Sequence, residues 1–269
     1  MALPICRTCG VQYEVPRSDC PICLDERQYV GWGGQQWTSL EELRSEGFHG
    51  RVGEEGPGVF GIGCEPTFAI GQRALLLHSE TGNILWDCIT YLDDDLVAAI
   101  NELGGVSAIA ISHPHYYASM VEWSRAFDAP VLIHSADRQW VTRPDPAISF
   151  WEGDSREIAP GMTLVNAGVH FAGGTVLHWS AGEDRPAALF SGDIVQVVMD
   201  RNWVSFMYSY PNLIPERRSV VRRAVKLLEP YTFERIYGAW WGRVVDSDGA
   251  AALSRSADRY LDYTSEETS

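Results

Sequence analysis

The stretch that decides the fold is Ser107-Ala-Ile-Ala-Ile-Ser-His-Pro-His-Tyr-Tyr117, an apolar run that ends in two histidines one residue apart. Its apolar part, Ala108 to Ile111, predicts a buried strand. Alternate residues of an extended segment point the same way. We therefore expect His113 and His115 to face one ion at the edge of a sheet.

Further polar residues stand at comparable positions along the chain. Asp87 ends the apolar run Leu85-Trp-Asp87, and Asp193 ends Phe190-Ser-Gly-Asp193. His170 comes just before Gly173-Gly174, and His134 ends another apolar run. Because strand ends gather at sheet edges, these residues are candidates for the same site.

From Glu65 onward, segments typical of strands and helices alternate, which predicts a layered α/β or α+β domain. The expected strands are 67–70, 74–78, 84–87, 107–112, 131–134, 148–151, 163–166, 175–179, 187–191 and 235–237. The expected helices are 93–103, 117–127, 136–141, 215–228 and 249–263. The preceding region, 31–64, is predicted to be a linker with one short helix over 39–45, and its glycine-rich part, 50–63, a loop.

In this order the motifs resemble those of the metallo-β-lactamase superfamily, over roughly Glu65 to Tyr263. The residues that match are Asp87, Ser112-His113-Pro-His115, His170-Phe-Ala-Gly-Gly174 and Ser191-Gly-Asp193. The resemblance implies an α+β fold, the four-layer αββα sandwich, over residues 65–269. It also implies a metal site of His113, His115 and His170 with Asp193 beside it. Asp87 and His134 are then expected behind the ligands, where they would orient them.

The sequence departs from the family pattern at three positions. Tyr117 and Ala118 stand where the family completes its HxHxDH motif, and Trp241 aligns with the last family histidine. In the family these positions form a second metal site. The resemblance therefore implies a mononuclear site here.

Cysteines mark a separate segment at the N-terminus. Cys6 and Cys9 form one CxxC pair, and Cys20 and Cys23 form a second. Two such turns supply four thiolates in a tetrahedron, which predicts a structural zinc site. Residues 1–30 thus resemble a zinc ribbon or a rubredoxin-like pair of knuckles.

Three imidazoles on Zn²⁺ leave an open position for water, which predicts hydrolysis of an ester, lactone, thioester or amide of a small molecule. Asp193 is the expected general base, and Tyr116 or Tyr117 could donate a hydrogen bond to an oxyanion. One alternative is an Fe²⁺ enzyme similar to the sulfur dioxygenases, with His113, His170 and Asp193 as ligands. Another is a binding protein on a degenerate scaffold.

The charge of the chain narrows the classes of partner. It carries 21 basic and 36 acidic side chains, a net charge of −15. Such a chain repels phosphate backbones and anionic membranes, so we expect neither nucleic acid nor a membrane as a partner. We see no signal peptide and no apolar run long enough to span a bilayer, and we expect a cytoplasmic enzyme. The oligomeric state is not predicted.

Overall fold

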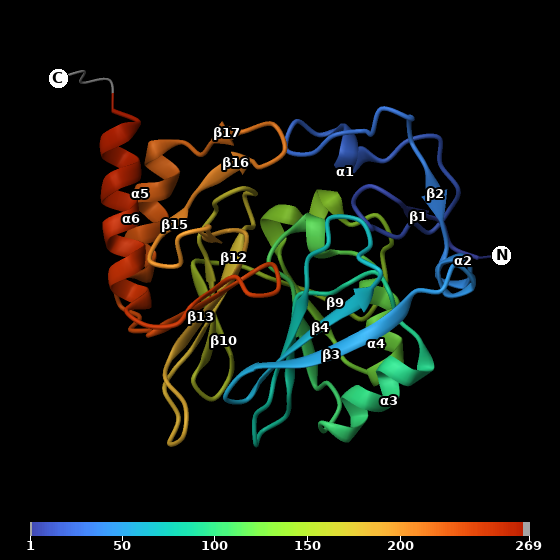
Figure 1. Cartoon of the computed structure of the whole chain (residues 1–269), viewed down its shortest axis with the longest axis horizontal. Helices are drawn as coiled ribbons and strands as arrows, with labels where there is room; N and C mark the ends of the chain where they lie inside the picture. Colours follow the sequence, from blue (N-terminus) through green and yellow to red (C-terminus); the bar gives the residue numbers. More distant parts are fainter. Residues whose placement is uncertain (1, 266–269) are drawn as a thin grey trace. The chain divides into compact units, whose positions relative to one another are not determined.

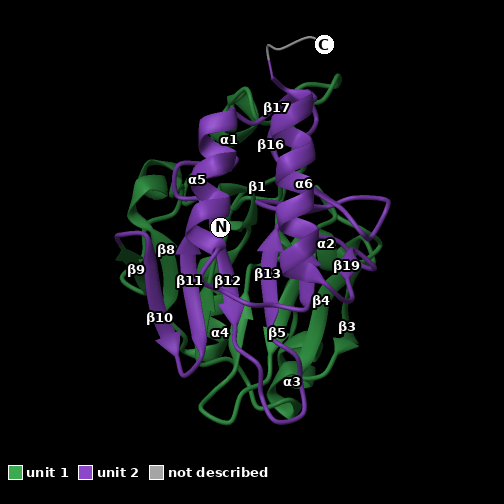
Figure 2. Cartoon of the chain, turned by 90° about the vertical axis from the view of Figure 1, so that its left-hand side faces the viewer, with its two compact units in different colours: residues 1–151 green, residues 152–269 purple. Residues whose placement is uncertain are grey.

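The structure is a computed structural model that describes residues 2–265. The chain divides into two compact units, residues 1–151 and 152–269 (Figure 2). The division falls inside the segment that we predicted as one domain, and the boundaries at residues 30 and 64 stay predictions.

The first unit contains a seven-stranded sheet in which the strands follow one another in chain order. Strands β3 to β6 pair antiparallel, whereas β6 to β9 pair parallel. The strands are β3 (His49–Gly56), β4 (Val59–Glu65), β5 (Ala74–Leu77), β6 (Ile84–Trp86), β7 (Ala108–Ala110), β8 (Val131–His134) and β9 (Ile148–Trp151). Parallel pairing places the ends of β6, β7 and β8 at one edge of the sheet.

Helices and 3-10 turns connect the parallel strands of this unit. They are α3 (Asp94–Glu102), η1 (Pro114–Tyr116), α4 (Met120–Phe127) and η2 (Ser135–Trp140). Asp93 caps α3, because its side chain accepts a hydrogen bond from the backbone of Leu96. The predicted helix over 117–127 begins three residues late, since 3-10 geometry occupies the stretch after His113.

The N-terminal segment of the first unit has little regular structure (Figure 1, blue). A two-stranded sheet joins β1 (Ile5–Cys6) to β2 (Trp37–Thr38). Two short helices, α1 (Pro21–Leu24) and α2 (Leu40–Ser45), complete it.

The second unit contains a six-stranded mixed sheet, in the order β10-β11-β12-β13-β18-β19. Only β13 and β18 pair parallel. The strands are β10 (Ser155–Ala159), β11 (Met162–Asn166), β12 (Thr175–Trp179), β13 (Ala188–Gly192), β18 (Arg235–Gly238) and β19 (Val244–Val245). Two small sheets add β14 (Gln196–Val197) with β15 (Val204–Ser205), and β16 (Met207–Ser209) with β17 (Ile214–Pro215).

Helices α5 (Arg218–Leu228) and α6 (Gly249–Tyr263) lie side by side in this unit (Figure 2). Their apolar faces pack into one core with the sheet, through Val221, Ala224, Leu253 and Ala257. No helix among residues 2–265 is both long and apolar enough to cross a bilayer.

Two predictions of local structure are wrong. Residues 67–70 form a turn, whereas the glycine-rich stretch predicted as a loop belongs to strands β3 and β4. Helix α3 lies close against β3: a Cβ atom added at Gly50 would lie 2.8 Å from the Cβ of Leu96. Glycine at this position leaves room for the helix, and this close packing cannot be read from composition.

Replacing Gly50 with alanine should therefore destabilise the first unit. Overpacking of this kind typically costs about 1–3 kcal/mol, measurable as a shift of the urea midpoint. Gly31→Ala is the matched control, because no atom lies within 4 Å of the added Cβ. Equal stability of the two variants would contradict close packing of α3 on β3.

Candidate metal centre

After β7, His113 stands at the N-cap of the 3-10 turn η1 and His115 lies within it. Asp87 holds the backbone that leads into this turn. The carboxylate of Asp87 accepts a hydrogen bond of 2.7 Å from the backbone N–H of Ser112. The Ser112 hydroxyl lies 2.8 Å from Nδ1 of His113. Asp87 is 1% exposed and has a φ of +65°, a conformation that non-glycine residues rarely adopt. That Asp87 supports a metal site stays a prediction.

The two histidine rings of this turn lie close together. Their centroids are 5.2 Å apart and their planes are nearly perpendicular. Both side chains are buried. With Nδ1 of His113 held by Ser112, the Nε2 atom of that ring is the one placed to bind a cation.

His170 is held by two hydrogen bonds in the second unit. Its backbone N–H donates to the carboxylate of Glu216 over 2.9 Å, and its Nδ1–H donates to the carbonyl of Tyr208 over 2.7 Å. Because a carbonyl can only accept, Nδ1 carries the proton and Nε2 carries a lone pair. The backbone of His170 has a φ of +67°. The loop that carries it turns tightly, because a Cβ atom added at Gly174 would lie 2.2 Å from the carbonyl oxygen of Val169.

Asp193 follows directly after β13 and is 3% exposed. Its backbone carbonyl accepts a hydrogen bond from the hydroxyl of Tyr210, whose ring lies 5.5 Å from that of His170. Burial raises the pKa of the Asp193 carboxyl to about 7. A cation beside it would favour the carboxylate and lower that pKa.

One nitrogen or oxygen atom from each of His113, His115, His170 and Asp193 lies within 4.8 Å of the other three, and all four residues are buried. Ligand atoms about 2.1 Å from one ion lie within about 4.2 Å of each other. The four residues could therefore hold a metal ion. Imidazoles and a carboxylate suit divalent zinc or iron, so the donor set fits the metal that the sequence predicts.

The four N-terminal cysteines form a second group that could hold a metal ion. The Sγ atoms of Cys6 and Cys23 are 3.6 Å apart, as are those of Cys9 and Cys20. Four thiolates around one Zn²⁺ would lie about 3.8 Å apart. Hydrogen bonds from Cys20 and Cys23 lower the pKa of Cys6, which favours the thiolate that binds metal.

Hydrogen bonds from outside the cysteine group also reach its sulfur atoms. The Tyr13 hydroxyl lies 3.0 Å from Sγ of Cys20, and the Gln35 amide donates to Sγ of Cys6 over 3.2 Å. Such donors offset the negative charge of four thiolates.

The other predicted site residues lie as follows. The hydroxyls of Tyr116 and Tyr117 donate to the carbonyls of Arg73 and Asp137, both over 3.2 Å. An oxyanion role for either tyrosine would require that bond to break, and it stays a prediction. His134 accepts a hydrogen bond from the backbone of Ala136 and is not in the four-residue group. Trp241 follows β18 in a partly exposed loop.

Sequence reasoning missed the residues that orient the ligands. Ser112 could have been found from its place beside His113. Tyr208, Tyr210 and Glu216 gave no signal, because they reach His170 and Asp193 from about 17 to 46 residues away along the chain.

Comparison with known proteins gives one relative of similar length. The chain is 49% identical to the uncharacterized protein YmaE of Bacillus subtilis (strain 168) over 261 aligned residues. The alignment covers 96% of this chain and 95% of YmaE. No protein-family model matches the chain.

Solved structures reveal the fold. The DIM-1 metallo-β-lactamase matches with a TM-score of 0.60 at 12% identity, over 80% of this chain and 99% of that enzyme. A B3 metallo-β-lactamase with an active-site glutamic acid matches with a TM-score of 0.55 at 13% identity, over 84% of this chain and 94% of that enzyme. The predicted fold is thus confirmed: two mixed sheets with helices in the metallo-β-lactamase fold, and an N-terminal cluster of four cysteines.

Ser112→Ala should weaken metal binding by the histidine group, because Nδ1 of His113 loses the partner that fixes its ring. Loss of such a contact typically lowers metal affinity about 10- to 100-fold. Competition with a chelator of known affinity measures the change. Ser124→Ala is the control, since it removes a buried hydroxyl that bonds only to the Ala129 carbonyl. Equal affinities in the two variants would show that Ser112 does not orient the ligand.

Proposed function

Because the chain belongs to the family of the Bacillus subtilis protein YmaE and has the metallo-β-lactamase fold, we propose that it is a metal-dependent hydrolase. The observation that carries the proposal is the buried group of His113, His115, His170 and Asp193. Burying four such side chains together costs free energy unless a ligand holds them. A bound divalent cation would activate water at neutral pH and polarise a carbonyl group.

Different residues have different proposed roles in hydrolysis. The three histidines would hold the cation, and the contacts of Ser112 and Tyr208 orient the rings of His113 and His170. Asp193 is the proposed general base, which takes a proton from the attacking water and returns it to the leaving group. Its burial shields that proton transfer from bulk solvent.

The proposed centre is mononuclear. Tyr117 stands where the family places a second-site ligand, but its hydroxyl donates to the Asp137 carbonyl. Burial raises the pKa of Tyr117 well above its ordinary value, which favours the neutral phenol over a phenolate ligand. Ala118 and Trp241 have no side-chain atom that could bind a metal.

The proposed substrate is a small molecule with an ester, lactone, thioester or amide bond. The amide class gains support from the names of the structural neighbours, which are β-lactamases. The net charge of −15 argues against nucleic acid. None of the six cysteines forms a disulfide in the structure, which suits a reducing compartment, and we propose that the enzyme works in the cytoplasm.

A second candidate function follows from the same donor set. His113, His170 and Asp193 make up two histidines and one carboxylate, the set that oxygenases use to hold Fe²⁺. Zinc with hydrolysis in air-free buffer supports the hydrolase, whereas iron with oxygen uptake supports the oxygenase.

The double variant His113→Ala and His170→Ala tests the proposal. We expect metal analysis to find two ions per wild-type chain and one per variant chain, since the cysteine group keeps its zinc. Hydrolysis of a panel of small esters, lactones, thioesters and amides should fall at least about a hundredfold. His49→Ala, which changes an exposed histidine, should retain both ions. A wild-type chain that holds only the cysteine-bound ion would falsify the proposal.

A further inference from the structure

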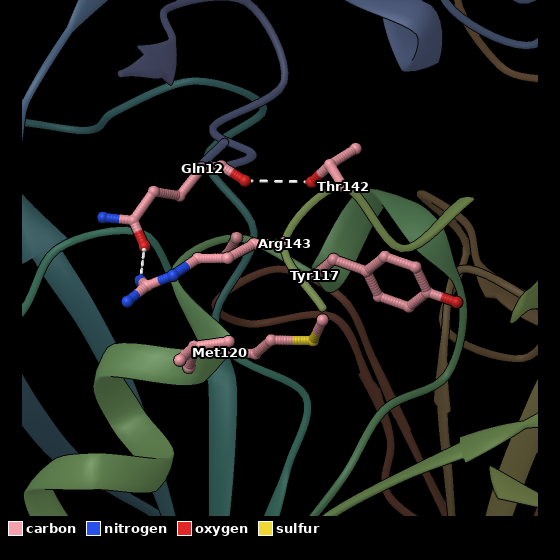
Figure 3. Close-up of a pocket in the computed structure, with 7 residues that line it drawn as sticks. Gln12, Tyr117, Met120, Thr142 and Arg143 are labelled. Carbon is pink, nitrogen blue, oxygen red and sulfur yellow. Dashed lines mark hydrogen bonds between the residues drawn. The ribbon is translucent and has the colours of Figure 1, made fainter. Parts of the chain in front are cut away.

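The backbone between the two cysteine pairs contacts the loops around the histidine turn within the first unit. The hydroxyl of Thr90 donates to the carbonyl of Gly10 over 2.8 Å. The backbone N–H of Gln12 donates to the carbonyl of Ala118 over 2.9 Å. The hydroxyl of Thr142 donates to the carbonyl of Gln12, also over 2.9 Å (Figure 3). Three loops far apart in the sequence are thus tied to one short segment.

The side chain of Gln12 strengthens this contact. The guanidinium of Arg143 donates to the amide oxygen of Gln12 (Figure 3). It also donates to the carboxylate of Glu122. Gln12 is 4% exposed and Arg143 is 7% exposed. A buried guanidinium needs its acceptors, so this pair holds the segment in place. The cavity between Gln12, Met120 and Thr142 has a volume of about 10 Å³, room for about one water molecule.

The contact at Ala118 bears on the metal ligands. Ala118 lies three residues after His115, and its φ of +40° is unusual for alanine. The start of the turn is held by Asp87 through Ser112, as described above. Its end is held by Gln12 at Ala118 and by the Ser119 hydroxyl, which donates to the carbonyl of Thr90 over 2.7 Å. The hydroxyl of Thr90 in turn donates to the carbonyl of Gly10. The end of the turn is therefore linked to the N-terminal segment directly through Ala118 and indirectly through Ser119 and Thr90.

The shape of that segment depends on its cysteines. Residues 4–13 contain the two-residue strand β1, a bridge between Ile5 and Gln12, and hydrogen bonds from the backbone N–H groups of Cys6, Gly10 and Tyr13 to the carbonyls of Val11, Cys6 and Pro4. A segment this small has too little core to hold its conformation without a bound ion. Metal bound by the four thiolates would therefore add to the hydrogen bonds that hold Gly10 and Gln12 in position.

We propose that the four-cysteine segment is a zinc-dependent clamp on the histidine turn: zinc bound to Cys6, Cys9, Cys20 and Cys23 raises the affinity of the histidine group for its own cation. Gln12 and Thr142 are positioning residues that act through Ala118. This inference deepens the proposed function and rests on the metal group on which that function depends. The two sites are coupled without sharing a ligand, so emptying the first weakens the second.

The first test keeps all four cysteines. The double variant Gln12→Ala and Thr142→Val removes two hydrogen bonds of the clamp. We expect the cysteine zinc to stay bound, while the affinity of the histidine group for Zn²⁺ falls about fivefold for each lost bond. Hydrogen exchange of the amides over residues 113–119 should become faster. Gln12→Ala with Thr142→Ser keeps the hydroxyl and should recover part of the loss, whereas Ser124→Ala should change neither quantity.

The second test empties the cysteine site. Cys20→Ser should release the zinc of that segment, accelerate exchange over residues 113–119 and lower the Zn²⁺ affinity of the histidine group by more than tenfold. Where this variant fails to fold, the double variant carries the test alone.

The outcomes separate the two proposals. If the wild-type chain binds two ions but the double variant matches Ser124→Ala in Zn²⁺ affinity and in exchange, the clamp is wrong and the hydrolase proposal stands. If the wild-type histidine group binds no ion, the hydrolase proposal is wrong. The exchange measurement then still decides whether the segment holds the turn, and unchanged exchange overturns the clamp.

Discussion

Three imidazoles and a carboxylate buried within a few ångströms of one another set the main constraint on this protein. Removing such groups from water costs free energy, and a carboxylate without a cation is driven toward its protonated form. The raised pKa of Asp193 expresses that cost. A cation bound by the group would offset the cost, which supports the proposal that the group is a metal site.

Holding such a group together needs support behind each ligand. Ser112 fixes one ring, a backbone carbonyl fixes His170, and Tyr210 bonds to the backbone at Asp193. Asp87 and His170 both have positive φ angles, which surrounding hydrogen bonds maintain. The ligands are thus oriented largely by the chain around them. The cysteine segment extends the same principle, because its backbone holds the end of the histidine turn.

The relation between fold and chemistry here is indirect. The solved neighbours share the fold at 12–13% identity, and a fold alone does not specify an activity. What distinguishes this chain is local: one intact donor set, a neutral tyrosine and an alanine where a second site would need ligands, and an added thiolate cluster. These features underlie our proposal of a single-metal centre on a fold that the solved neighbours, which are β-lactamases, share.

By itself the sequence determined the ligand types, the cysteine pairs and most strands and helices, because metal binding and apolar periodicity depend on residue identity and spacing over short distances. The run from Ser107 to Tyr117 predicted a strand followed by two metal ligands; the strand is present, and both histidines belong to a group that could hold a metal ion. Only the tertiary structure decided that the glycine-rich stretch is paired as β3 and β4, that Tyr117 bonds to Asp137, and that Gln12 bonds to Ala118. Those outcomes depend on hydrogen bonds and close packing, the longest of them between residues 106 positions apart in the sequence, which no local pattern encodes.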